Sequence, residues 1–191
     1  MADRELRIRV AGSGGQGAML AGVLLAEAGI FDGLHVAQTQ TYGPQARLGA
    51  AAADVILSPE PIAVPHIAEP DVLVCLSHVG FEKYGDVLAP EGLRLLDERF
   101  APDVRDGGRT IALPLLRVAA DEHSERAVNV VALGALLCVR DVVSRSALRE
   151  ALERRVKPEY RTLNRRALAL GYRLVRARRD SCADHAQYAA R

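Results

Sequence analysis

Tryptophan is absent from this 191-residue sequence, and aromatic residues of all kinds make up only 4% of it. Cysteine is also scarce, because Cys75, Cys138 and Cys182 are the only three and lie far apart. A disulfide framework, a zinc knuckle and an iron–sulfur cluster each need paired or clustered thiols. No Cys-x-x-Cys pair is present, so the sequence argues against all three kinds of site.

Long hydrophobic runs are lacking as well. No apolar stretch approaches the roughly 20 residues that a membrane span requires, and residues 1–9 are charged rather than built around an apolar signal core. The formal net charge of +1 gives no general attraction to nucleic acid or to a membrane surface. These features predict a soluble, cytoplasmic protein in a reducing compartment, with no nucleic-acid partner and no membrane span.

The charge is unevenly distributed along the chain. Residues 140–191 contain 14 arginines and lysines but only 6 aspartates and glutamates. Two interpretations of this basic segment are open: a solvated helix face, or a surface that meets an acidic partner. With 49% hydrophobic and 26% charged residues, the composition is that of an ordinary globular protein, and disorder is excluded.

Hydrophobic periodicity predicts alternating strands and helices. The predicted strands are Leu6–Ala11, Leu34–Thr39, Ala50–Leu57, Asp71–Leu76, Leu93–Asp97 and Thr110–Leu113. The predicted helices are Ala18–Gly29, Val79–Leu88, Ala127–Val139, one capped by Ser146 that runs through Val156, and an amphipathic one over Glu159–Arg178. This alternation is typical of an α/β protein. We expect a single Rossmann-like domain over residues 1–180, with a mostly parallel sheet and C-terminal helices, followed by a frayed tail at 181–191.

A glycine-rich turn links the first predicted strand to the first predicted helix. Gly12, Gly14 and Gly17 have the Gly-x-Gly-x-x-Gly spacing, which lets backbone amides at a helix N-terminus approach an anion. A dinucleotide site also needs an acidic residue about 20 positions further on, but the second strand ends in Gln38-Thr39-Gln40. Three interpretations remain: a nicotinamide dinucleotide site, a turn that only packs a helix on the sheet, or a turn that contacts another anion. If Gly14 has a positive φ, a side chain at that position would cost about 1 kcal/mol or more.

Other polar groups follow the predicted strands at the same edge. In a parallel sheet the glycine turn, the Thr41–Gly49 loop and Ser77-His78 would lie together at the carboxyl ends of the strands. The Arg47 guanidinium can grip a phosphate or a carboxylate with two donors, and Tyr42 adds a hydroxyl on a rigid ring. The five histidines show no metal-ligand spacing, and Cys75 and Cys138 are expected to be inert core thiols.

Two segments taken together are distinctive. Arg7–Gly17, which ends in Gly-Gly-Gln-Gly, is followed by Gln38–Arg47, which ends in Tyr-Gly-Pro-Gln-Ala-Arg. The chain closely resembles the gamma subunit, or gamma domain, of the 2-oxoacid:acceptor (ferredoxin) oxidoreductase family. The likeness continues through Asp71–Val74, Asn129–Ala135 and Leu163–Tyr172, and therefore covers nearly the whole sequence.

The resemblance implies a subunit of a complex that oxidatively decarboxylates a 2-oxoacid to its acyl-CoA. Such complexes use thiamine diphosphate, magnesium, iron–sulfur clusters and coenzyme A. This sequence has neither a Gly-Asp-Gly…Asn diphosphate signature nor a cysteine cluster, so it is similar to the subunit that carries neither the thiamine diphosphate nor an iron–sulfur cluster. The expected partners are the alpha, beta and cluster-bearing subunits, with ferredoxin or an NAD-linked subunit as acceptor.

The function that the resemblance implies is therefore an accessory one, and the chain is expected to be inactive alone. The substrate would be 2-oxoglutarate or an aromatic oxoacid such as phenylglyoxylate or indolepyruvate. No catalytic residue and no metal ligand is expected on this chain. The residues expected to contact the substrate or the coenzyme A region are Gly12, Gly14, Gly15, Gln16, Gly17, Tyr42 and Arg47. Two alternatives are open: a free-standing Rossmann-type nucleotide-binding oxidoreductase, and a purely structural interaction module.

Overall fold

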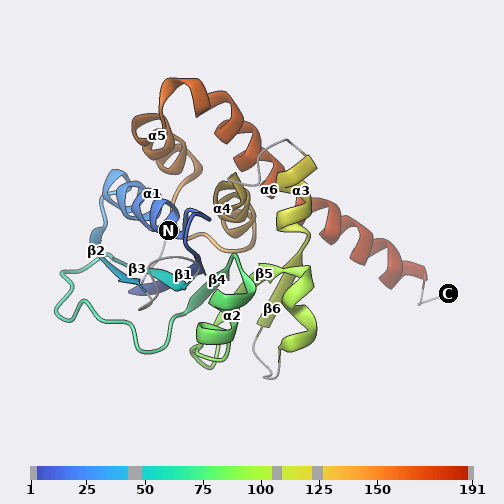
Figure 1. Ribbon diagram of the computed structural model, residues 1–191, viewed down its shortest axis with the longest axis horizontal. Coiled ribbons are helices and arrows are strands. Elements are labelled where there is room, and N and C mark those ends of the chain that lie inside the picture. The colour runs from blue at the N-terminus through green and yellow to red at the C-terminus, as the bar shows by residue number, and fades with distance from the viewer. Residues whose placement is uncertain (1–3, 43–48, 105–108, 122–126, 189–191) are drawn as a thin grey trace.

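A computed structural model describes residues 4–42, 49–104, 109–121 and 127–188 (Figure 1), with backbone alone for residue 103 and residues 178–188. Six strands form one sheet in the order β2-β3-β1-β4-β5-β6. The strands are β1 (Leu6–Ser13), β2 (His35–Tyr42), β3 (Ala50–Ser58), β4 (Val72–Cys75), β5 (Leu93–Asp97) and β6 (Arg109–Leu113). Each strand lies at or next to the position predicted from the sequence.

A helix follows each of β1, β4, β5 and β6, whereas, in the described residues, β2 and β3 are each followed by the next strand. The helices are α1 (Ala18–Phe31), α2 (His78–Tyr84), the 3₁₀ helix η1 (Glu98–Asp103), α3 (Leu115–Asp121), α4 (Val128–Val139), α5 (Arg145–Arg155) and α6 (Pro158–Tyr188). The expectation of an α/β domain with a mostly parallel sheet and C-terminal helices is confirmed. None of the helices in the described ranges combines the length and the apolar content needed to cross a membrane.

The sheet is not parallel throughout. β1, β4, β5 and β6 run parallel, whereas β3 is antiparallel to both of its neighbours, β1 and β2. The β1–α1–β2 crossover therefore leaves a gap one strand wide, and β3 fills that gap by turning back from β2. Periodicity alone could not show this direction, because Ala50–Leu57 is buried on both faces and reads the same in either orientation.

The two faces of the sheet are covered unequally. In Figure 1, α1, α4, α5 and α6 lie above the sheet, while α2 lies below it. Leu6, Ile8 and Val10 alternate along β1 and enter the larger core, which includes residues from all four of these upper helices. On the other face, Phe81 and Phe100 cover a smaller cluster around Leu73 and Cys75.

A buried ion pair holds the lower face of β1. The Arg9 guanidinium donates to both carboxylate oxygens of Asp54 on β3 at 2.7 Å and to the Ile67 carbonyl at 2.8 Å. The hydrogen bond with Asp54 raises the pKa of Arg9. Arg9 is only 9% exposed and lies 5.2 Å from the Tyr84 ring centroid. The contacts tie β1, β3 and the β3–β4 connection together, since a buried charge is tolerated only when paired.

Two C-terminal helix boundaries differ from the sequence prediction. The α5 N-cap is Ser144 rather than Ser146, because the Ser144 hydroxyl accepts a hydrogen bond from the Ala147 amide at 3.1 Å. Asp32 fixes this choice: its carboxylate accepts from both the amide and the hydroxyl of Ser144. The last helix is also longer than expected and continues to Tyr188. The division at residue 180 stays a prediction.

The closest helix crossing joins α4 to α6. A Cβ added at Gly134 would collide with the Leu168 carbonyl oxygen, and one added at Gly171 would collide with the Val131 carbonyl oxygen. The two glycines thus let the helix backbones touch where the upper layer packs. Neither neighbouring atom can move independently, because both belong to helix backbone.

We predict that Gly171→Ala destabilises the protein although alanine is the better helix former. Helix propensity alone would stabilise the variant by about 1 kcal/mol, but overpacking against backbone costs about 2 kcal/mol or more beyond that gain. The melting temperature should fall by about 5 °C or more for a domain of this size. An unchanged or higher melting temperature, measured by circular dichroism, would show that the helices are not in contact at this glycine.

Candidate functional site

The sheet register brings the polar strand ends to one edge. Tyr42 pairs with Ala51 on β3, and Ala51 pairs with Gly12 on β1, so the ends of β1 and β2 lie in one row. Because β4 and β5 are parallel to β1, Ser77 and Asp97 follow at the same edge. In open α/β sheets, ligands bind at this carboxyl edge.

The glycine turn begins where β1 ends. Positive φ occurs at Gly15 (92°) and Gly17 (75°) and not at Gly14, so a left-handed penalty for a side chain at Gly14 does not apply. Gln16 closes the turn through two hydrogen bonds. Its backbone N–H donates to the Ser13 carbonyl at 3.3 Å, and its side-chain Oε1 accepts from the Ser13 backbone N–H at 3.0 Å. A Cβ at Gly15 would meet nothing within 4 Å. The outer side of the turn is therefore open to a ligand.

Helix α1 begins at this turn without a side-chain cap. Gly17 is its N-cap, accepts the first helical hydrogen bond from Ala21 at 2.9 Å, and offers no side-chain oxygen. No acidic residue lies in the first turn. The amides of the first turn and the positive end of the helix dipole are consequently left without a carboxylate, an arrangement that favours an anion nearby.

Asn129 on α4 supports the turn. This residue is 2% exposed on α4, and its side-chain amide donates to the Gly17 carbonyl at 3.1 Å. A Cβ at Gly17 would lie 2.5 Å from the Asn129 amide nitrogen. The turn is therefore fixed by the left-handed backbone of Gly17 and by its close fit against Asn129. The sequence signal for Asn129 was a single polar residue in an otherwise apolar predicted helix, which needs a buried partner.

A shallow groove of about 420 Å³ lies beside the turn. It is lined by Gln16, Ser77, His78, Arg99, Phe100 and Leu116. Ser77 accepts a hydrogen bond from the Gly80 amide at 3.0 Å and caps α2, while the His78 ring lies edge-on to Phe100 at 5.9 Å. Gly80 lets α2 come this close, since a Cβ there would lie 2.9 Å from the Gly12 nitrogen.

Arg99 is the cation of this groove and was missed in the sequence analysis. Its Nε donates to Asp97 at 2.9 Å, and the Arg99 side chain is 63% exposed while that of Asp97 is 2% exposed. Asp97 also accepts from the Arg99 and Leu116 amides, at 3.2 and 2.8 Å. This buried carboxylate orients Arg99 and leaves its terminal nitrogens at the surface. An Asp-x-Arg sequence directly after a predicted strand was the available signal.

A second hollow extends the groove along the edge. Its volume is about 320 Å³, and it shares Arg99 and Leu116 with the first while adding Arg117. The Arg117 side chain lies 3.9 Å from Glu98. We call the two hollows together the edge groove. It runs from Gln16 to Arg117, presents two guanidinium groups and is open to solvent, so it can accept an extended anionic ligand.

The predicted site residues are only partly brought together. Gln16, which belongs to the glycine turn, lines the same hollow as Ser77 and His78. Tyr42 is 66% exposed, donates to Gln40 at 2.7 Å, and lies two strands from Gly12, roughly 10 Å away. Arg47 lies outside the described residues. β3 therefore separates the end of β2 from the turn, which removes the second anchor that a dinucleotide site requires.

Thiol and metal chemistry have little support at this edge. Burial raises the pKa of the Cys75 thiol to about 12, as expected for an inert core cysteine. Cys138, expected in the core, is instead partly exposed. Among the residues that the structure describes, no group of three or more His, Cys, Asp or Glu side chains could hold a metal ion.

We predict that Gly17 and Asn129 are energetically coupled. Gly17→Ala introduces both a left-handed strain of about 1 kcal/mol or more and a collision with Asn129. Asn129→Ala removes the side chain with which the new Cβ collides. The double variant should therefore lose at least 1 kcal/mol less free energy of unfolding than the sum of the losses in the two single variants. Urea denaturation of all four proteins measures this difference. Strictly additive costs would mean that the two residues are not in contact.

Comparisons with known proteins agree with this geometry. A family model described as pyruvate ferredoxin/flavodoxin oxidoreductase matches residues 7–174. The 2-oxoglutarate synthase subunit KorC of Methanocaldococcus jannaschii is 37% identical, with 88% of this chain and 93% of that protein covered.

Two solved structures have the same fold. The gamma subunit of a keto/oxoacid ferredoxin oxidoreductase from Geobacter sulfurreducens has a TM-score of 0.79 and 35% identity, covering 90% of this chain and 99% of that one. The 2-oxoglutarate:ferredoxin oxidoreductase of Magnetococcus marinus, solved with 2-oxoglutarate, coenzyme A and succinyl-CoA, has a TM-score of 0.83 and 28% identity over 92% of this chain and 32% of that one. The chain therefore belongs to the pyruvate ferredoxin/flavodoxin oxidoreductase family, in which it corresponds to the gamma subunit.

Proposed function

We propose that this gamma subunit serves a complex that oxidatively decarboxylates 2-oxoglutarate to succinyl-CoA with ferredoxin as acceptor, and that its edge groove binds coenzyme A. The observation that carries the proposal is the exposed Arg99 guanidinium, oriented by buried Asp97 beside an uncapped helix N-terminus. The choice of 2-oxoglutarate is supported by a 37% identical relative named as a 2-oxoglutarate synthase subunit. An aromatic oxoacid and an NAD-linked acceptor are the competing choices.

The edge groove suits the chemistry of coenzyme A. The coenzyme is long and carries phosphates along part of its length, and the groove extends over two adjoining hollows with Arg99 where they meet. Arg99 and Arg117 can hold phosphate oxygens through charge-assisted hydrogen bonds. The amides of the Gly12–Gly17 turn offer a second anion contact. We also retain Tyr42 and Arg47 as proposed contacts, with Arg47 in the segment outside the described residues.

The part played by this chain is binding and orientation. Thiamine diphosphate with magnesium and the iron–sulfur clusters, held by the alpha, beta and cluster-bearing subunits, would supply the decarboxylation and the electron transfer. This chain's own residues would fix the anionic portion of the coenzyme, so that its thiol end is presented to the neighbouring subunits. Positioning of this kind lowers the entropy lost on reaction. For this reason the isolated chain should be inactive.

We predict that Arg99→Ala raises the KM for coenzyme A about tenfold or more in the assembled complex. The lost contact is a charge-assisted hydrogen bond worth roughly 1.5–3 kcal/mol, and 1.4 kcal/mol corresponds to about a factor of ten. Arg99→Lys should restore only part of the affinity, because a point charge replaces a two-pronged donor. The KM for the oxoacid should remain unchanged. Steady-state kinetics with each substrate varied separately provides the measurement.

Arg154→Ala is the matched control, since Arg154 has the same 63% exposure and also pairs with one carboxylate, but lies on α5. If the Arg99→Ala complex assembles with both KM values within twofold of wild type, the proposed coenzyme contact is wrong. A rise confined to the oxoacid KM would assign the groove to that substrate instead. Assaying the same preparation with 2-oxoglutarate, phenylglyoxylate and indolepyruvate tests the choice of oxoacid.

A further inference from the structure

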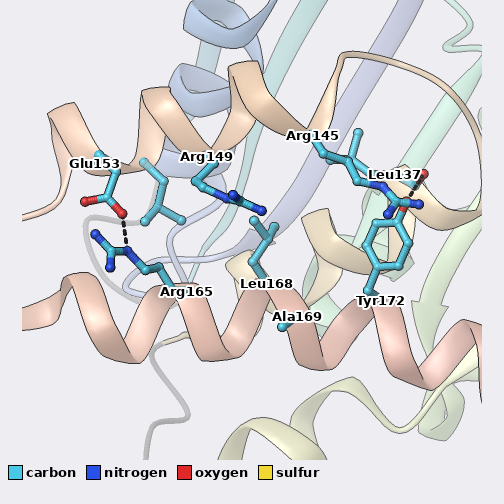
Figure 2. A pocket seen from close by; sticks show the side chains of 9 residues that line it. Leu137, Arg145, Arg149, Glu153, Arg165, Leu168, Ala169 and Tyr172 are labelled. Carbon is cyan, nitrogen blue, oxygen red and sulfur yellow. Dashed lines mark hydrogen bonds and ion pairs between the residues drawn. The ribbon is translucent and has the colours of Figure 1, made fainter.

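A third hollow, separate from the two that form the edge groove, lies between α5 and α6. Its volume is about 620 Å³, and Figure 2 shows its floor and walls. The apolar part consists of Leu137, Leu152, Leu168, Ala169 and Tyr172. We call it the helix groove. Ala169 is exposed to solvent, Leu168 and Tyr172 are partly exposed, and Leu137 and Leu152 are buried beneath them.

The helix groove carries an excess of positive charge. Arg145, Arg149, Glu153 and Arg165 contribute to its lining. Arg165 forms an ion pair with Glu153, as Figure 2 shows, and this hydrogen bond is the main cause that lowers the pKa of Glu153. Glu153 is thus ionised and neutralised by its partner. Two guanidinium groups, those of Arg145 and Arg149, remain in excess.

Neither of these two arginines has a carboxylate partner within ion-pair distance among the described residues. Arg145 is nevertheless held in place, because its guanidinium carbon lies 3.6 Å from the centroid of the Tyr172 ring. Arg149 extends into the space between the helices above Leu168 (Figure 2). A cation that is already fixed on an aromatic ring loses little conformational freedom when it meets an anion. The groove therefore presents two cations above an apolar floor, and one of them, Arg145, is already held in place.

We propose that the helix groove is the docking site for an acidic, amphipathic segment of a neighbouring subunit. Such a segment would place apolar side chains on the Leu168 and Ala169 floor and carboxylates against Arg145 and Arg149. Arginine and tyrosine around a desolvated apolar centre are the composition of strong protein–protein contacts. The groove is open between two parallel walls of helix rather than enclosed, so an extended chain fits it better than a small metabolite. The inference rests on membership in a multisubunit complex, not on the choice of oxoacid or on the edge groove.

Charge reversal tests the electrostatic part. The double variant Arg145→Glu/Arg149→Glu should bind the remaining subunits of its purified complex at least 30-fold more weakly than wild type, measured by biolayer interferometry. Wild-type binding should weaken as salt is raised, and the variant should lose most of that dependence. Glutamate at position 145, in the first turn of α5, suits the helix dipole; position 149 lies in the second turn, so circular dichroism of the variant should confirm that it folds. Arg145→Gln/Arg149→Gln provides a second variant with no new repulsion, and its expected loss is about fivefold or more.

Arg166→Glu/Arg173→Glu is the matched control. Both arginines are exposed on α6, neither lines the helix groove, and the change in net charge is the same. This control should bind within twofold of wild type. If it weakens binding as much as the groove variant, a general charge effect operates and the docking site is wrong. Wild-type affinity in both groove variants would also overturn the proposal, while membership in the complex would stand.

A photo-reactive amino acid at position 169 identifies the occupant directly. In the assembled complex we expect it to cross-link to a segment of another subunit that has net negative charge and apolar residues spaced along it. A cross-link to a basic segment, or to a second copy of this chain, would overturn the proposal. So would an assembled complex in which position 169 forms no cross-link to protein, because the groove would then be free for a small ligand.

Discussion

The insertion of β3 between β1 and β2 is the constraint on which the rest of the site depends. It keeps the two strand ends at the same edge of the sheet but separates them by a full strand. In a dinucleotide site, the acidic residue that binds the ribose stands at the end of the strand beside the glycine turn, and here the start of the antiparallel β3 occupies that place. The glycine turn is therefore left to face β4 and β5, where Ser77, His78 and Arg99 lie.

The glycine turn contacts α4, and α4 packs directly against α6. Asn129 joins the turn to α4, and the glycine contact between α4 and α6 holds α4 in place. The edge groove lies beside the glycine turn, whereas the helix groove lies between α5 and α6. One presents backbone amides and Arg99 to an anion, and the other presents Arg145 and Arg149 above an apolar floor. In the proposed complex, the first surface would serve a shared substrate and the second a partner subunit.

Much of the fold could be predicted from the sequence because burial leaves a periodic trace. The alternation in β1 and the apolar run of β4 identified strands, and the continuous apolar segment before Cys138 identified α4. The direction of β3 left no such trace, since a strand buried on both faces reads alike either way. The choice of Ser144 over Ser146 depends on Asp32, which is 112 residues away. Arg99 gains its place only because Asp97 is buried at the end of β5.

The proposed role of the edge groove is to take up coenzyme A within the complex. Backbone hydrogen exchange of the assembled complex, with and without coenzyme A, tests it most directly because the turn is expected to contact the ligand through its amides. Peptides that cover residues 12–20 and 97–100 should become at least several-fold slower to exchange on addition of the coenzyme, while α5 peptides over Arg145–Arg155 remain unchanged. If saturating coenzyme A slows exchange in other subunits but in neither of these two segments, the edge groove does not bind the coenzyme.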